Sequence, residues 1–137
     1  MTITIHKLDH IAIIVENLEK ALLPYTEALG LIHTPIEYIE SHQVRVTFIP
    51  LGQTQIELIE PLNSHGKLAR FLQKTGGGLH HVAIEVANIE DSIRDLQTHG
   101  IEMNNSHPQP GAQGSLVAFT KRRSFDGVII ELIQKHS

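Results

Sequence analysis

Short runs of apolar and β-branched residues alternate with helical patterns along the chain. Leu8–Val15 and Leu79–Val86 have the length and composition of strands, so we expect a strand at each. Both runs are followed by an asparagine that can cap a helix, Asn17 and Asn88. A glutamate lies two residues further on in each case, where it favours the positive end of the helix dipole. The pattern therefore predicts a strand followed by a helix, twice.

Glycines mark the ends of both predicted helices, at Gly30 and Gly100. Pro24 lies inside the first helix, and we expect it to bend or shorten that helix because proline removes a backbone hydrogen bond. A further short helix is expected at Gly66–Lys74. Three more strands are predicted after each of the first two helices: around 32–39, 43–50 and 54–60, and around 101–105, 115–120 and 127–134.

The second half of the chain repeats the first. Leu8–Glu19 aligns with Leu79–Glu90, and Ile56–Ile59 aligns with Ile130–Ile133. A repeat that holds at both ends of so long a segment indicates two copies of one module. We therefore predict an α+β fold in which two βαβββ modules form paired curved sheets around one cleft. The expected single domain is 1–137, with modules at about 5–61 and about 78–135 and a linker at 62–77.

The composition is that of an ordinary globular protein. Hydrophobic residues make up 41% and charged residues 19% of the 137 residues, which argues against disorder. Apolar runs such as Ile11–Val15 are far shorter than the ~20 residues that cross a bilayer, and Met1–His10 has no apolar leader region. A net charge of −4 without a basic run argues against nucleic acid or an anionic membrane as the main partner. We expect a cytoplasmic protein that binds neither.

The chain has no cysteine, which excludes disulfides, thiolate metal sites and cysteine nucleophiles together. Any metal ion must therefore be held by histidine, aspartate or glutamate. The ten histidines are many for a chain of this length, so they are the first place to look for chemistry.

Strand alternation places four polar side chains on equivalent faces. With Ile13 and Val15 packed on the helix, His10 points to the opposite face, and the second copy puts His81 there. The last strands of the modules likewise direct Glu57 and Glu131 away from the helices.

A carboxylate among isoleucine and leucine is costly to bury, and here that cost recurs at matched positions beside matched histidines. We therefore predict that His10, Glu57, His81 and Glu131 bind one divalent metal ion such as Zn, Co, Ni, Mn or Fe. Asp9 either orients His10 or serves as a simple turn carboxylate. The remaining histidines are expected to be structural or exposed.

Several stretches resemble the vicinal oxygen chelate superfamily, which includes glyoxalase I, bleomycin-resistance proteins and extradiol dioxygenases. Within it, the chain is most similar to the methylmalonyl-CoA epimerase family. The stretches that carry the resemblance include Leu8-Asp-His-Ile-Ala-Ile13, Ile56-Glu-Leu-Ile-Glu-Pro-Leu62, Gly78-Leu-His-His-Val-Ala-Ile-Glu-Val86 and Pro108-Gln-Pro-Gly-Ala-Gln-Gly114.

The resemblance implies an isomerase that removes the proton between a carboxylate and a thioester carbonyl through a metal-stabilised enolate. It carries metal ligation onto His10, His81, Glu131 and Glu57, and it makes Glu131 the candidate for one of the two proton transfers. Two positions depart from the family pattern. Val46 stands where some epimerases have a second catalytic glutamate, and the usual His-Pro-Lys-Ser segment reads Lys121-Arg-Arg-Ser124.

Two other functions fit the same four residues. A glyoxalase-I-type lactoylglutathione lyase would use the same ligands with a glutathione adduct as substrate. A metal-assisted small-molecule-binding or resistance protein would need only a cleft, so four retained ligands argue against it. A dioxygenase is the least favoured, because that family typically keeps a two-histidine, one-carboxylate site in a longer chain.

An acyl-CoA substrate carries phosphates that need cationic partners. Two groups of basic residues are candidates: Lys67, Arg70 and Lys74, and Lys121, Arg122 and Arg123. We favour Arg122 and Arg123, because consecutive cations without an anionic partner repel one another and because they precede Glu131 in the chain. The alternative is that both groups are solvated surface charges. We also expect a homodimer, since superfamily members are commonly dimers and open sheet edges tend to pair.

Overall fold

A computed structural model describes residues 3–136 of the chain. The backbone divides into two compact units. Unit 1 comprises Met1–His10 and His81–Ser137, and unit 2 comprises Ile11–His80. The first strand, β1 (Ile5–Ile14), contributes its first residues to unit 1 and its last residues to unit 2. The predicted boundaries of the modules and linker stay a prediction.

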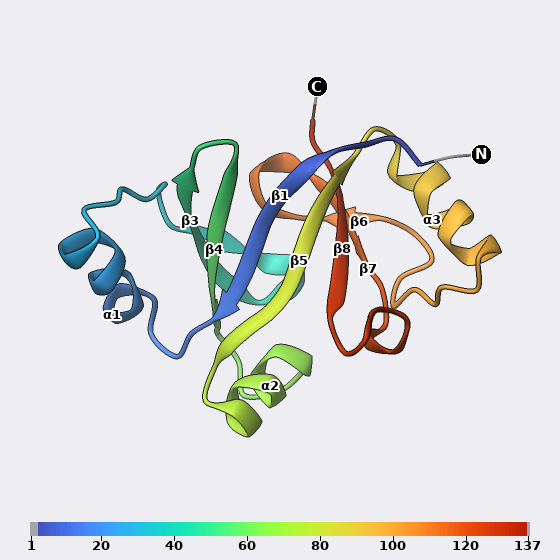
Figure 1. The fold of residues 1–137 in the computed structure, drawn as a ribbon. Helices are drawn as coiled ribbons and strands as arrows, with labels where there is room; N and C mark the ends of the chain where they lie inside the picture. Colours follow the sequence, from blue (N-terminus) through green and yellow to red (C-terminus); the bar gives the residue numbers. More distant parts are fainter. Residues whose placement is uncertain (1–2, 137) are drawn as a thin grey trace. The chain divides into compact units, whose positions relative to one another are not determined.

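The order of the elements is βαβββ, twice, as the repeat predicts (Figure 1). The first copy consists of β1, α1 (Leu18–Leu23), β2 (Glu37–Ile39), β3 (Val44–Leu51) and β4 (Thr54–Pro61). The second consists of β5 (Gly78–Val86), α3 (Ile89–Thr98), β6 (Gln109–Pro110), β7 (Leu116–Phe119) and β8 (Ile129–Gln134). Helix α2 (Lys67–Thr75) lies between them in the sequence. No helix among the described residues is long and apolar enough to cross a membrane.

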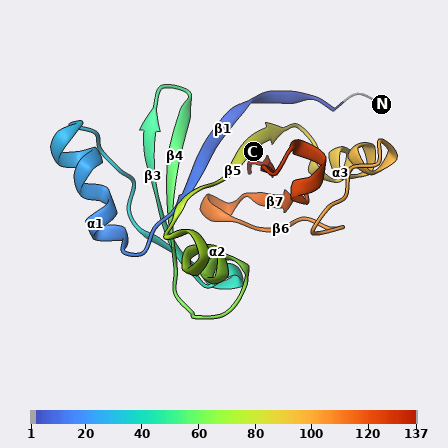
Figure 2. The same ribbon diagram turned by 60° about the horizontal axis from the view of Figure 1, so that its bottom comes forward.

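In unit 2, α1 packs on an antiparallel β3–β4 hairpin (Figures 1 and 2). The short strand β2 pairs with β3, also antiparallel. Leu18 and Leu22 of α1 pack against Ile49 of β3 and Leu58 of β4. The side chain of Asn17 accepts a hydrogen bond from the backbone N–H of Lys20 at 2.8 Å, so the predicted helix cap is confirmed.

Pro24 ends the α-helical hydrogen-bonding pattern of α1, as expected. The chain continues in a π-helical turn, Pro24–Ala28, and the N–H of Leu29 donates to the carbonyl of Pro24 at 3.1 Å. Gly30 then takes a positive φ of 69°. The α-helix therefore ends at Leu23, and a wider π-helical turn follows it.

Unit 1 repeats this arrangement with a parallel pair at its centre. β5 and β8 run parallel, and β7 and β6 follow β8 in antiparallel pairing. Ile89 and Ile93 of α3 pack against Ala118 of β7 and Leu132 of β8. Asn88 caps α3 by accepting from the N–H of Asp91 at 2.9 Å.

Two predicted strands are shorter than expected. The strand around 32–39 is reduced to β2. Thr34 keeps one backbone bond to β3, from its N–H to the carbonyl of Phe48 at 2.8 Å, while the N–H of Phe48 donates to the Thr34 side chain. The strand around 101–105 is only a single bridge between Met103 and Thr120. The backbone bonds from Asn104 to Phe119 and from Lys121 to Glu102 hold this bridge, and beyond it the N–H of Phe119 donates to the side chain of Asn105.

A tight backbone approach within unit 2 predicts a strong substitution effect. A Cβ added to Gly77, whose φ is +106°, would lie 2.6 Å from the carbonyl oxygen of Ile14. Gly77→Ala should therefore lower the free energy of unfolding by about 2 kcal/mol or more, measured by urea denaturation. Gly76→Ala is the matched control, because its φ of +78° is strained but nothing lies within 4 Å of the added atom. Equal losses in the two variants would contradict the close approach.

Candidate metal centre

The parallel pairing of β5 and β8 sets the side chains of His81 and Glu131 on one face. Ala83 is opposite Glu131 in the register of the pair. Ile84 and Leu132, the next residues along, pack on the α3 side. Because side chains alternate along a strand, His81 and Glu131 point away from α3. The face predicted for these two residues is confirmed.

His10 and His81 converge on the same carboxylate oxygen. The Nε2 atom of His10 lies 3.1 Å from Oε1 of Glu131, and the Nε2 atom of His81 lies 2.8 Å from it. The two imidazole rings have centroids 5.8 Å apart and an interplanar angle of 73°. All three residues are buried. The structure thus brings three of the four predicted ligands together, all within unit 1.

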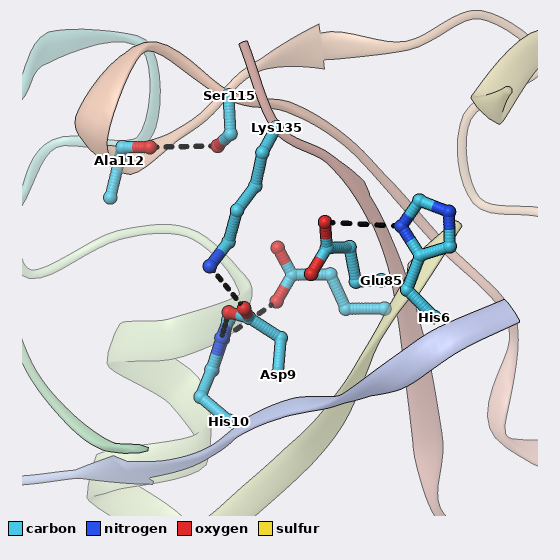
Figure 3. Close-up of polar contacts among 8 residues, drawn as sticks. His6, Asp9, His10, Glu85, Ala112, Ser115 and Lys135 are labelled. Atoms are coloured by element: carbon cyan, nitrogen blue, oxygen red, sulfur yellow. Dashed lines mark hydrogen bonds and ion pairs between the residues drawn. The ribbon is translucent and has the colours of Figure 1, made fainter. Parts of the chain in front are cut away.

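Asp9 and Lys135 form a second layer behind His10 (Figure 3). Nδ1 of His10 donates to Oδ2 of Asp9 at 2.7 Å, and Nζ of Lys135 lies 2.6 Å from Oδ1 of the same carboxylate. Of the two roles considered for Asp9, the contacts show the orienting one. Lys135 was not predicted, although alternation along β8 places it on the face of Glu131.

Apolar side chains surround the cluster. Phe119 of β7 meets the ring of His81 edge-on, with centroids 5.3 Å apart. Ala83, Val117 and Ile133 are buried in the same group of contacts. Such surroundings exclude water and strengthen electrostatic interactions between the polar atoms.

The buried carboxylates of Glu131 and Asp9 are held ionised by their partners. Burial of the Glu131 carboxyl raises its pKa, but hydrogen bonds with His10 and His81 lower it by more, so that the pKa is about 2. The same balance applies to Asp9, where burial is outweighed by hydrogen bonds with His10 and Lys135 and the pKa is about 2. The site therefore holds two carboxylates that stay negative at neutral pH.

A further His–Glu contact lies on the same strands. Glu85 is on the His81 face of β5, and its Oε2 lies 3.4 Å from Nδ1 of His6 on β1 (Figure 3). The side chain of His6 is half exposed and that of Glu85 is largely buried. Strand alternation predicts the face of Glu85, but the contact with His6 has no signal in the sequence.

Glu57 belongs to unit 2 and is buried on β4, opposite Phe48 of β3. Its neighbours Ile56 and Leu58 pack on the α1 side. Alternation therefore directs Glu57 away from the helix, as predicted.

The two arginines proposed for phosphate binding lie in the 3₁₀ turn Arg122–Phe125 before β8. Arg122 donates to the carbonyl of Gly127 at 3.1 Å, and Nη1 of Arg123 lies 3.1 Å from a carboxylate oxygen of Glu102. Lys121 also pairs with Glu102, at 3.7 Å. The premise that these cations have no anionic partner is therefore wrong. Their role in binding stays a prediction.

The arrangement of His10, His81 and Glu131 fits a divalent ion. Ligand atoms bonded to one ion at about 2.0–2.1 Å are separated by about 3 Å, because they occupy neighbouring corners of a coordination polyhedron. The distances of 2.8 and 3.1 Å to Glu131 match this spacing. One ligand atom of each residue lies within 4.8 Å of the others. The contact of His10 with Glu131 needs a proton on Nε2, and a cation that binds there replaces that proton.

The βαβββ repeat, with buried histidines and a buried glutamate on its strands, is shared with a known class of proteins. The chain belongs to the Glyoxalase/Bleomycin resistance protein/Dioxygenase superfamily, whose family model matches residues 9–119. The resemblance seen in the sequence motifs is confirmed.

Within that superfamily the chain is similar to methylmalonyl-CoA epimerases. It is 39% identical to the mitochondrial methylmalonyl-CoA epimerase of Mus musculus over 129 residues, which are 93% of this chain and 72% of the relative. It is 36% identical to the ethylmalonyl-CoA/methylmalonyl-CoA epimerase of Cereibacter sphaeroides, over 95% of this chain and 98% of the relative. The crystal structure of methylmalonyl-CoA epimerase from Mycobacterium tuberculosis superposes with a TM-score of 0.93 at 27% identity, covering 100% of this chain and 93% of that one.

Proposed function

We propose that this protein is a metal-dependent epimerase, an isomerase that inverts the carbon between the carboxylate and the thioester of an acyl-CoA such as methylmalonyl-CoA. The observation that carries the proposal is the convergence of His10 and His81 on one oxygen of Glu131 in a buried site. The similarity to methylmalonyl-CoA epimerases over more than nine-tenths of the chain supports the choice of substrate.

The chemistry begins with a C–H bond that is acidic because it lies between two carbonyl groups. When that bond breaks, its electron pair delocalises into the thioester carbonyl and the proton passes to a base. We assign the base, or the acid of the reverse step, to Glu131, which is ionised in this site. Protonation from the opposite face then inverts the carbon. A divalent ion held at the site supplies positive charge that stabilises the charge developing on the thioester oxygen.

We propose Glu57 as a fourth ligand on the strength of the internal repeat. It occupies the position in β4 that Glu131 occupies in β8, and it is buried although its side chain is ionisable. Burial of a carboxylate is costly unless a charge or hydrogen bond compensates it. In this proposal the two modules form one domain, and each contributes one histidine and one glutamate. The identity of the metal, among Zn, Co, Ni and Mn, follows from availability as much as from the ligands.

We further propose that the protein forms a homodimer in the cytoplasm. Large apolar side chains are exposed on two strands, with Ile5 of β1 at 58% and Leu79 of β5 at 63% exposure. A second copy that covered either side chain would remove apolar area from water.

The activity is tested by following methylmalonyl-CoA in deuterium oxide with added divalent metals. The proposal predicts metal-dependent deuterium incorporation at C2 together with inversion of the centre, and no isomerisation of a glutathione hemithioacetal. Turnover of the hemithioacetal instead would assign a glyoxalase-type lyase. Tight binding of small molecules without either reaction would assign a binding protein.

Removal of a ligand tests the metal centre. His81→Ala should weaken divalent-ion binding by more than the ~10–100-fold typical of losing a residue behind a ligand, and should abolish turnover. Glu57→Ala should also weaken binding if Glu57 is a ligand. The matched control is His80→Ala, since His80 precedes His81 and contacts Phe71 of α2 instead, with ring centroids 5.0 Å apart.

Metal content is measured by elemental analysis of dialysed protein, and folding by circular dichroism. An unchanged metal-to-protein ratio in folded His81→Ala would overturn the assignment of that residue. The same result for Glu57→Ala would remove only the fourth ligand.

Substrate recognition by the basic turn is tested by a double change. Arg122→Ala with Arg123→Ala should raise KM for the acyl-CoA about 3- to 10-fold with little loss of kcat, the pattern of uniform binding. Arg94→Ala is the control, because Arg94 is an exposed cation of α3 paired with Asp91. An unchanged acyl-CoA KM would mean that Arg122 and Arg123 serve their own turn and Glu102 alone.

A further inference from the structure

The two histidines of the metal centre are supported differently. His10 is preceded by Asp9, whereas the equivalent histidine of the repeat, His81, is preceded by His80. The residue after β8 is Lys135, whereas the equivalent position after Ile56–Ile59 and Glu60 is Pro61. The first module therefore has a proline where the second has Lys135, and the second module has a histidine where the first has Asp9. An Asp–Lys pair lies beside His10, whereas the equivalent positions of the sequence are His80 and Pro61.

The contacts run in a line from the surface to the centre (Figure 3). Lys135 is partly exposed, at 37%, and its Nζ lies 2.6 Å from Oδ1 of Asp9. Asp9 is 2% exposed, and its other oxygen, Oδ2, accepts from Nδ1 of His10 at 2.7 Å. Nε2 of His10 then faces Oε1 of Glu131 at 3.1 Å. Each step of the line is a hydrogen bond or an ion pair between unlike groups.

This geometry fixes both the ring and the tautomer of His10. A proton on Nδ1 that is donated to Asp9 leaves the Nε2 lone pair available to a cation. The carboxylate of Asp9 can hold that orientation only while its own charge is compensated, because a buried and unpaired carboxylate is costly. Lys135 compensates it from the solvent side.

We propose that Lys135 is a positioning residue for the metal centre: through Asp9 it holds His10 in the orientation and tautomer that bind a divalent ion. This inference rests on the proposed metal-dependent function. It makes the affinity of the centre depend on a side chain that touches neither metal nor substrate.

Co²⁺ is the probe, because its visible absorption reports on the ligands and its binding is measured without turnover. Lys135→Met should raise the Kd for Co²⁺ about 10- to 100-fold, the usual effect of losing a residue behind a ligand, and should alter the absorption bands. Lys135→Arg should restore binding to within about 3-fold, because the guanidinium keeps the charge and the hydrogen bond. Lys20→Met, which removes the same charge from an exposed position of α1, should leave the Kd unchanged.

Two further readouts separate positioning from general destabilisation. Asp9→Asn combined with Lys135→Met should weaken Co²⁺ binding less than the product of the two single effects, since both changes act on one line of contacts. With Zn²⁺ bound, nitrogen NMR of His10 should show a proton held on Nδ1 in the parent chain and a weakened signal of that proton in Lys135→Met. A purely structural role predicts a lower Tm of the metal-free protein with an unchanged Kd.

The outcomes distinguish this inference from the function on which it rests. Equal Co²⁺ affinity in Lys135→Met and the parent chain would overturn the role of Lys135 and leave the metal centre standing. Absence of Co²⁺ binding to the parent chain would overturn the metal centre, and the role of Lys135 with it.

Discussion

One carboxylate oxygen of Glu131 is the shared contact of two buried histidines in unit 1. Two imidazole nitrogens from different strands approach it within 3.1 Å, and the whole group is buried among apolar side chains. A carboxylate in such a place is tolerated only with compensating charge or hydrogen bonds. The histidines provide them, and the low pKa of Glu131 reflects the strength of that compensation. The proposed chemistry depends on the same condition, because only an ionised carboxylate can bind a cation or accept a proton.

Strand pairing explains why these side chains converge. Parallel pairing of β5 and β8 places His81 and Glu131 on one face at a fixed register, and α3 covers the opposite face. His10 reaches the same oxygen from β1, whose first residues belong to the same unit. Three elements from distant parts of the sequence thus position three side chains without any flexible loop in the ligand set. A site on rigid strands holds its geometry better than a site on loops.

Much of this arrangement was predictable from the sequence. The internal repeat constrains the order of the elements, and strand alternation constrains the face on which each side chain lies. The repeat predicted βαβββ twice, and alternation placed His10, His81 and Glu131 on the faces where they lie. The failures come from local side-chain bonding that no periodicity records. The N–H of Phe119 donates to the side chain of Asn105, and the N–H of Phe48 donates to the side chain of Thr34, beside two expected strands that are reduced. Glu102, which pairs with Arg123 and Lys121, lies too far away in the sequence for its contact to be predicted. Lys135 was not predicted, because its pairing with Asp9 depends on how segments from opposite ends of the chain meet.

X-ray absorption spectroscopy of the Co²⁺-loaded protein tests the central claim most directly, because it counts imidazole ligands at the bound ion. The parent chain should show scattering from two imidazoles together with oxygen ligands at about 2.0–2.2 Å, and His81→Ala, where it retains any ion, should show one imidazole. A spectrum with oxygen ligands alone, or one that is the same in both proteins, would contradict a metal centre built on His10, His81 and Glu131.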